Sequence, residues 1–354
     1  MQNPSVLLHG PHEASIEDRP IPVLSETNDL IVRISYVGVC GSDVHFWNNG
    51  GHLGRIREPL VMGHEAAGIV HAVGPGVTNL APGDRVALEP GIPCRKCGDC
   101  KAGLYNICRK MVFAASPPYP GTLTRFYATS ADYCYKIPNT MPLQEAVLME
   151  PLAVAVHGVR LAGVSFGHKV VVFGAGTVGL FCAAVARDYG AAAVLSVDIL
   201  PNKLAFAKTF IGTHVGKTAM PDSSLTSEEN ARLLIETHEL GDGADIVIDA
   251  SGAEASINTG IHLLRSRGTY VQVGMGRRHV NFPISEVSDR EIVVKGSFRY
   301  GAGDFETAMS LVARGFIDLK PLITNIFPFE QATEAWEATS RGEGIKNIIE
   351  GPKN

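Results

Sequence analysis

Residues 170–179 read VVVFGAGTVG, so four apolar residues lead directly into three glycines spaced as G-x-G-x-x-G. A short, continuously apolar run before glycine is typical of a strand buried in a parallel sheet, and Gly179 to Asp188 continue as a helix. The first glycine permits a tight turn, the second lets a ligand approach the backbone, and the third lets helix and strand pack closely. The stretch therefore predicts a strand, a glycine turn and a helix in direct succession.

The next predicted strand ends at an acidic residue. Asp198 lies 19 residues after Gly179, close to the spacing of about 20 at which a ribose-binding carboxylate follows this pattern. Such a carboxylate accepts from both ribose hydroxyls of NAD and repels the 2′-phosphate of NADP, and no arginine follows it at once. A bare glycine turn is the alternative, but strand, glycines and acid are all present. We predict an NAD site that includes Gly174, Gly176, Val178, Gly179, Asp198 and the nearby Lys203.

Strands and helices continue to alternate on the C-terminal side of this unit. Alternation of this kind indicates a parallel, doubly wound sheet of the Rossmann type. The expected strands are Ala193–Val197, Asp245–Asp249, Thr269–Val273 and Ile292–Lys295, and the expected helices are Lys203–Phe210, Ile257–Leu264, Phe305–Arg314 and Phe329–Thr339.

The first part of the chain, up to about residue 150, has a different texture. Short β-branched runs, separated by glycine and proline turns, predict a β-rich domain there. The runs are Leu30–Val37, Ala67–Val73 and Arg85–Leu88.

Composition and charge exclude several classes of protein. The 354 residues suggest two domains, and 45% hydrophobic against 19% charged residues excludes a disordered or coiled-coil chain. The net charge is −5 and no basic block occurs, so we expect no nucleic-acid partner. Met1 to Gly10 lack a secretory signal, and the longest charge-free stretch carries glycines at its centre, so we expect a cytoplasmic protein without a membrane partner.

Four of the seven cysteines crowd into one short segment with the spacing C-x2-C-x2-C-x7-C. Disulfide pairs would be spread along the chain, so a reducing compartment and metal ligation fit better. Four thiolates close a tetrahedral shell, which predicts a structural zinc rather than a catalytic one. Four free buried cysteines are the alternative. The expected ligands are Cys94, Cys97, Cys100 and Cys108, whereas Cys134 and Cys182 are expected in the core.

A second group of metal-binding residue types is dispersed along the chain. A catalytic zinc needs about three protein ligands and one open position. Cys40, His64, Glu65 and Glu150 meet that requirement. Each has an ordinary alternative, namely a small core residue, a core histidine or a charge at a helix N-terminus. Spacing alone does not decide between these alternatives.

Several motifs together carry a family resemblance. Residues 39–45 (VCGSDVH), 63–65 (GHE), the cysteine segment and the glycine turn together resemble the zinc-dependent medium-chain dehydrogenases. Residues 149–152 (MEPL) and 297–300 (SFRY) are similar to the polyol branch, which acts on sorbitol, xylitol or L-arabinitol. Residues 89–94 (EPGIPC) and 296–301 (GSFRYG) look most like the fungal xylitol dehydrogenases. The resemblance covers essentially the whole chain.

The resemblance implies an α/β fold made of a GroES-like catalytic domain and a Rossmann domain. The expected limits are residues 1–151 for the catalytic domain with its zinc lobe and 152–284 for the NAD-binding domain. Residues 285–354 would complete both the catalytic domain and the NAD-binding domain. It also implies a homo-oligomer, a tetramer or dimer, that oxidises a polyol to a ketose, most simply xylitol to D-xylulose. L-arabinitol or sorbitol oxidation is the alternative, and a non-catalytic NAD-binding protein on the same fold is a rival from another class.

The resemblance also suggests roles for individual residues. Cys40, His64 and Glu65 would bind catalytic zinc, with Glu150 in its shell directly or through water. In the proposed mechanism Ser42 is the first proton carrier and His45 exchanges with solvent. A helix cap and a surface histidine are the alternatives for these two. The substrate would contact Phe46, Phe113, Glu150, Arg299 and Tyr300, and the nicotinamide would lie near Val273, Met275 and Phe298. A domain-closing salt bridge is the alternative for Arg299, and ordinary packing is the alternative for Phe46, Phe113, Val273 and Met275.

Two positions depart from the family pattern. Thr177 stands where proline is usual in the glycine turn, and Phe46 replaces the tyrosine of sorbitol and xylitol enzymes. L-arabinitol dehydrogenases resemble this chain in carrying phenylalanine there, so Phe46 bears directly on the substrate.

Overall fold

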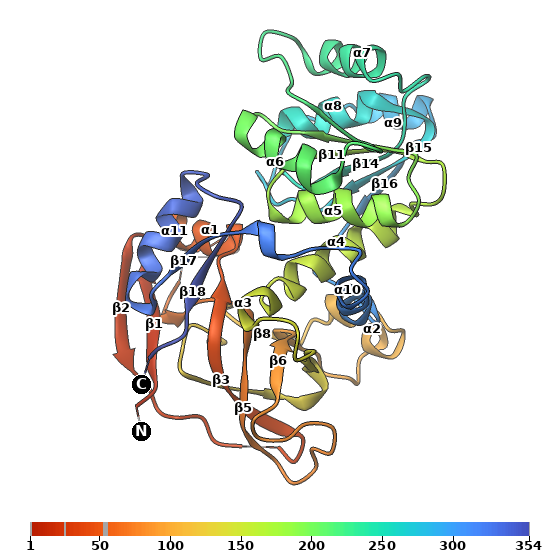
Figure 1. Ribbon diagram of the computed structural model, residues 1–354. Helices are drawn as coiled ribbons and strands as arrows, with labels where there is room; N and C mark the ends of the chain where they lie inside the picture. Colours follow the sequence, from red (N-terminus) through yellow and green to blue (C-terminus); the bar gives the residue numbers. More distant parts are fainter. Residues whose placement is uncertain (1, 25, 52–55, 354) are drawn as a thin grey trace. The chain divides into compact units, whose positions relative to one another are not determined.

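A computed structural model describes residues 2–24, 26–51 and 56–353 (Figure 1). Contacts between its residues divide the chain into two compact units. The first comprises Met1–Glu150 together with Met309–Asn354, and the second comprises Pro151–Ala308. The C-terminal segment therefore returns to the unit in which the chain begins.

The second unit is built on a six-stranded parallel sheet with the strand order β13-β12-β11-β14-β15-β16. The order reverses between β11 and β14, which is the arrangement of the doubly wound dinucleotide-binding fold. A helix occurs in every connection between consecutive strands (Figure 1). The strands are β11 (Lys169–Phe173), β12 (Ala193–Val197), β13 (Gly216–Ala219), β14 (Ala244–Asp249), β15 (Leu264–Gln272) and β16 (Val293–Gly296), and the helices are α5 (Thr177–Asp188), α6 (Pro201–Ile211), α7 (Ser227–Thr237), α8 (Glu254–Leu263) and α9 (Ile284–Asp289).

Burial explains the continuous apolar runs of this sheet. Val171, Val172 and Val247 are 0% exposed. Strands covered on both faces have no solvent-facing side to fill with polar residues. Two further helices belong partly to this unit, α4 (Met149–Ala162) and α10 (Asp304–Ala313).

The first unit contains a seven-stranded mixed sheet and a three-stranded sheet. Strand β3 (Asp29–Gly38) is the longest in the larger sheet and pairs with β5 (Glu65–Val73), β9 (Phe126–Ser130) and β18 (Lys346–Glu350). The other strands of that sheet are β6 (Arg85–Leu88), β10 (Cys134–Lys136) and β17 (Ile323–Phe327). The smaller sheet has the order β2-β1-β4, with β1 (Pro4–Gly10), β2 (Glu13–Asp18) and β4 (Leu60–Val61).

Pairing of β18 with β3 brings the C-terminal segment beside residues near position 40. Ile348 lies opposite Gly38, and Ile349 lies opposite Val37. Helix α11 (Ala332–Ser340) contacts α1 (Gly41–Asn49), and the rings of Trp336 and Trp47 lie 5.4 Å apart in the core of the unit. The C-terminal segment is therefore part of the framework around Cys40.

Every strand expected from the sequence is present, whereas several further elements were not predicted. The expected strands Ala193–Val197 and Arg85–Leu88 are confirmed with the same limits. Strand β13 and helix α7 were not predicted, although Thr226 and Glu229 form a capping box that marks the start of α7. The second unit continues past residue 284 to Ala308 because β16 pairs with β15 in the same sheet.

Candidate active site

The glycine turn between β11 and α5 has the geometry that its spacing predicts. Gly174 has a φ of +91°, a conformation that disfavours any side chain, and its N–H donates to Val197 O at 2.8 Å. A Cβ on Gly179 would lie 1.8 Å from Gly174 O, so the third glycine is needed for contact between turn and helix. Gly176 caps α5, and a Cβ there would meet open space. The helix N-terminus is thus accessible to an anionic group.

Hydrogen bonds to Asp198 hold this turn at the end of β12. Its carboxylate accepts from Ala175 N at 2.6 Å and from Leu200 N at 2.8 Å. Lys203 is half-buried on α6, and Val178 is half-buried on α5. Met275 and Phe298 are about half exposed in the same unit, at 48% and 50%, and Val273 is partly covered.

Asp249 is a buried acid of this region that the sequence interpretation missed. It ends β14, is 0% exposed, and accepts from Ser251 N and Gly252 N at 2.7 Å each. The loop that it holds packs against Gly174, since a Cβ there would lie 3.2 Å from Ala250 C. The signal was present as an acid at the end of an apolar strand, followed by serine and glycine.

The four clustered cysteines converge on one point. Their sulfur atoms all lie within 4.8 Å of one another, and Cys97 Sγ is 3.4 Å from Cys100 Sγ and 3.9 Å from Cys108 Sγ. Zinc–sulfur bonds of about 2.3 Å in a tetrahedron put sulfur atoms about 3.8 Å apart, so the donors fit this ion. Hydrogen bonds from the backbone N–H groups of Lys96 and Cys97 lower the pKa of Cys94 to about 6, whereas burial raises the pKa of Cys100 to about 12. Cys94 is therefore ionised more readily than Cys100 to the thiolate that metals bind.

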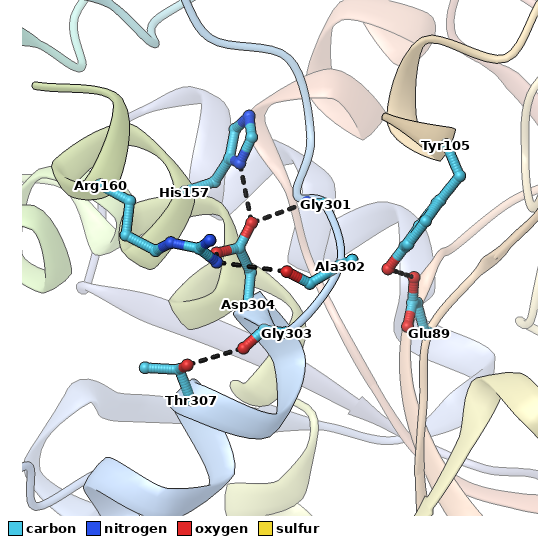
Figure 2. A network of polar contacts seen from close by, with 9 residues as sticks. All are labelled: Glu89, Tyr105, His157, Arg160, Gly301, Ala302, Gly303, Asp304 and Thr307. Carbon is cyan, nitrogen blue, oxygen red and sulfur yellow. Dashed lines mark hydrogen bonds and ion pairs between the residues drawn. The ribbon is translucent and has the colours of Figure 1, made fainter. Parts of the chain in front are cut away.

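A buried carboxylate holds this cysteine lobe, residues 94–108, to the sheet. Glu89 is 1% exposed and accepts from Tyr105 Oη at 2.7 Å and from Tyr135 Oη at 2.9 Å; the Tyr105 bond is drawn in Figure 2. On the other side, Arg95 pairs with Asp132 at 2.8 Å. The lobe is therefore tied to the first unit independently of any ion.

The dispersed donors meet because two neighbouring strands bring their ends together. Gly38, at the end of β3, lies opposite Glu65, at the start of β5. Cys40 follows two residues after β3, and His64 directly precedes β5. One donor atom from each of Cys40, His64 and Glu65 lies within 4.8 Å of the other two.

The charges around these donors suit a divalent cation. Burial, and after it the charges of Glu65 and Asp43, raise the pKa of the Cys40 thiol to about 11. Asp43 accepts from Cys40 N at 2.9 Å and lies 3.7 Å from His64 Nδ1. A bound dication offsets the cost of holding a thiolate and carboxylates away from water. The donor set and its surroundings therefore fit zinc.

Lys346 is a further member of this site that the sequence interpretation missed. Its ammonium pairs with Glu65, and both side chains are 2% exposed. It also donates to Val39 O at 2.9 Å. Only the pairing of β18 with β3 places this residue beside Glu65, so no local pattern could have indicated it.

Glu150 lies near the donors but outside their immediate group. It is the second residue of α4 and is 5% exposed. Burial raises its pKa to about 8, against an opposing effect of His64 and with reinforcement from Glu65 and Cys40. Among the described residues, the donors within 4.8 Å of one another are Cys40, His64 and Glu65 without Glu150. The position of Glu150 outside this group favours its contact with a bound ion through water over direct ligation.

The remaining predicted residues lie around these two centres. Ser42 and His45 are half-buried on α1, where the Ser42 side chain is hydrogen-bonded to Cys40. Phe113 is 7% exposed, with its ring 5.9 Å from that of His64. Phe46 is partly buried against the core of the first unit.

Arg299 and Tyr300 lie in the second unit, between β16 and α10. Arg299 has a φ of +57° and places its guanidinium 4.6 Å from the Phe298 ring centre. Tyr300 is 2% exposed and packs edge-on against Phe305.

Within the described ranges, no helix combines the length and the apolar character that crossing a bilayer requires.

Comparisons with known proteins agree with this architecture. Residues 26–139 match the alcohol dehydrogenase GroES-like domain, and residues 177–314 match the zinc-binding dehydrogenase family. A probable D-xylulose reductase A of Aspergillus terreus is 52% identical over 99% of this chain and 98% of its own length. D-xylulose reductase A of Aspergillus niger is 51% identical over 99% and 97%. An Escherichia coli oxidoreductase/dehydrogenase of unknown specificity has a TM-score of 0.91 at 31% identity, with both chains fully covered.

A Rossmann sheet with a glycine turn, joined in one chain to two sets of metal donors, defines a metal- and dinucleotide-dependent oxidoreductase. The chain belongs to the zinc-binding dehydrogenases with an alcohol dehydrogenase GroES-like domain.

Proposed function

We propose that the chain is an NAD-dependent zinc polyol dehydrogenase that interconverts xylitol and D-xylulose. The observation that carries this proposal is the identity of 51–52% with D-xylulose reductases A over nearly the whole of both chains. The intact donor set of Cys40, His64 and Glu65 supports it.

Each of the predicted site residues has a separate role in the reaction. Zinc held by Cys40, His64 and Glu65 would supply Lewis-acid polarisation of a substrate hydroxyl, and NAD at the glycine turn would accept hydride. Ser42 takes up the hydroxyl proton while its own hydroxyl proton moves to His45. His45 lies three residues further on the same helix, on the same face, and passes the proton to solvent.

Other residues orient the substrate and cofactor. Glu150 accepts from further hydroxyls or from water beside the metal donors, and Arg299 donates to substrate oxygens. An uncharged aromatic wall excludes water from the reacting carbon. Phe46 and Phe113 in the first unit would supply such a wall, and Tyr300 in the second unit would contact the substrate. Val273, Met275 and Phe298 would border the nicotinamide, and the rest of NAD would be held by Gly174, Gly176, Val178, Gly179, Asp198 and Lys203.

Steady-state rates on a panel of five- and six-carbon polyols test the proposal. With zinc-loaded protein and NAD, we expect xylitol to give the highest kcat/KM and D-xylulose to be reduced with NADH. Absence of turnover with every polyol of the panel would reject the function.

Phe46 favours a second candidate substrate, L-arabinitol. Its benzene ring lacks the hydroxyl of tyrosine, so it cannot hydrogen-bond a polyol oxygen. If this position selects the substrate, Phe46→Tyr shifts kcat/KM toward xylitol relative to L-arabinitol, by about tenfold for one hydrogen bond. An unchanged ratio would remove Phe46 as a determinant.

We further propose a cytoplasmic homo-oligomer, a dimer or tetramer. The edge strand β16 supports self-association, because Val293 and Val294 are 44% and 45% exposed beside unpaired backbone groups. All seven cysteines are free thiols, which suits a reducing compartment. Light scattering on the wild type and on Val294→Lys tests the assembly, and a monomeric wild type would contradict it.

A further inference from the structure

A buried carboxylate outside the proposed reaction steps lies five residues after Arg299. Asp304 begins α10, and its side chain is 1% exposed. One oxygen lies 2.7 Å from His157 Nδ1, and the other pairs with Arg160 (Figure 2). A carboxylate only accepts, so His157 carries its proton on Nδ1. His157 and Arg160 are three residues apart on α4 and therefore reach Asp304 from one face of that helix.

The same carboxylate is also hydrogen-bonded to the segment that precedes it in the sequence. Gly301 N donates to Asp304 Oδ2 at 2.7 Å, and Asp304 N donates back to Gly301 O at 3.2 Å. Arg160 also donates to Ala302 O at 3.3 Å (Figure 2). At the other end of the segment, Ser297 N donates to Gln272 O at 2.8 Å, which continues the β16 ladder. Residues 298–300 thus span two fixed points.

Arg299 lies between these fixed points in a strained conformation. Its φ of +57° falls in the left-handed region, which a non-glycine residue occupies only when its surroundings impose it. Tyr300 next to it is buried against Phe305, so the segment has little freedom to relax. The bond from Gly301 to Asp304 restrains the backbone two residues after Arg299.

We propose that Asp304, held by His157 and Arg160, is a positioning residue that fixes the 297–301 segment and so presents Arg299 to the polyol. This inference rests on the proposed function, because it takes Arg299 as a substrate contact. Without the carboxylate, Gly301 loses its acceptor and Arg299 relaxes toward ordinary backbone angles. Substrate affinity then falls, whereas the glycine turn and Asp198 remain intact.

The test compares Asp304→Asn with wild type in the zinc-loaded protein. We expect KM for the preferred polyol to rise about tenfold, the scale of one relaxed backbone strain. The dissociation constant of NADH, followed by fluorescence, should change much less than KM, because the glycine turn and Asp198 keep their bonds and Phe298 is the one proposed nucleotide contact in the loosened segment. Amide hydrogen exchange at Gly301 should accelerate, because asparagine offers one neutral oxygen in place of two charged ones, and this measurement makes no reference to activity.

Asp245→Asn is the matched control. Asp245 also accepts from a backbone N–H, that of Lys169 at 2.8 Å, and from an arginine, Arg265, at 2.6 Å, but it lies at the amino end of β14. The Asp245→Asn substitution should lower thermal stability and leave the polyol KM unchanged. Equal effects of the two substitutions on KM would overturn the proposal. If Asp304→Asn does not fold, His157→Leu removes a single bond and should raise KM about threefold.

A double variant separates positioning from general damage. If Asp304 acts through Arg299, adding Asp304→Asn to Arg299→Ala causes no further rise in KM, whereas multiplied effects would overturn the inference. Failure of the proposed function has a different signature, namely a wild type that turns over no polyol. In that case the inference is rejected with it.

Discussion

The two groups of metal donors differ in how far the chain must fold to assemble them. The cysteine lobe takes all four sulfur donors from residues 94–108, whereas the other group joins Cys40 to His64 and Glu65 through the register of two strands. Three of the lobe cysteines are half-buried and Cys108 is buried, whereas the dispersed group lies beside a buried ion pair. A local site depends on its own turns, and a dispersed site depends on the whole first unit. The two sites should therefore respond differently to substitution.

The largest expected effect is that of Cys40→Ser on catalysis. Loss of a thiolate ligand should release the ion at the dispersed site and lower kcat/KM at least about a thousandfold, or about 4 kcal/mol of transition-state stabilisation. Zinc content should fall from about two ions per chain to one, while NADH affinity is retained. Metal analysis and fluorescence titration check this, with Cys182→Ala as a control that keeps both ions. Near-normal turnover in Cys40→Ser would refute the site.

In the lobe, Cys97→Ser should affect stability instead of catalysis. Three remaining thiolates bind zinc far more weakly, so the free energy of unfolding should fall by about 4 kcal/mol, a fraction of what structural zinc supplies. At temperatures where the variant is folded, turnover per ion at the dispersed site should match wild type. Thermal unfolding and metal analysis measure both. Loss of turnover in the folded, singly loaded variant would mean that the two sites are not independent.

The same difference explains what could be predicted from the sequence. The glycine turn and the cysteine lobe were predicted from spacing, because each requires only neighbours along the chain. The ligand group of Cys40, His64 and Glu65 was implied only by family resemblance. Lys346 was missed because nothing within its own segment signals that β18 pairs with β3.

Asp304 illustrates a second reason for failure. An acid at the start of a helix is ordinary in sequence, and its importance comes from a histidine and an arginine on a distant helix. Strand β13 was missed for a related reason. Its residues Gly216–Ala219 are short and mostly polar, and they form a strand because they add to the edge of an existing sheet.

Lys346→Met tests the dispersed site directly, because it removes the cation that pairs with Glu65. In protein treated with a chelator, the buried Glu65 charge then lacks its partner, and unfolding free energy should fall by about 3 kcal/mol. With zinc bound, the ion still neutralises Glu65, so the loss should be clearly smaller. Denaturant titrations with and without chelator give both values. Lys136→Met, which breaks the surface pair with Asp84, is the control and should cost at most about 1 kcal/mol in either state. Equal losses with and without chelator would show that Glu65 does not respond to the ion.

The smallest expected effect concerns the nucleotide site, which resembles the lobe in being predicted from local spacing. Asp198→Ala removes the carboxylate that would accept from the ribose and repel a 2′-phosphate, so the preference for NAD over NADP should fall about tenfold or more. Asp198 also accepts from Ala175 N and Leu200 N, and affinity for both cofactors should therefore weaken together. Only the ratio of kcat/KM values isolates the recognition of ribose from the support of the turn. Asp245→Asn, at the amino end of β14, should leave that ratio unchanged. An unaltered ratio in Asp198→Ala would assign this carboxylate to the turn alone, and selectivity would then have to arise from residues outside the glycine motif.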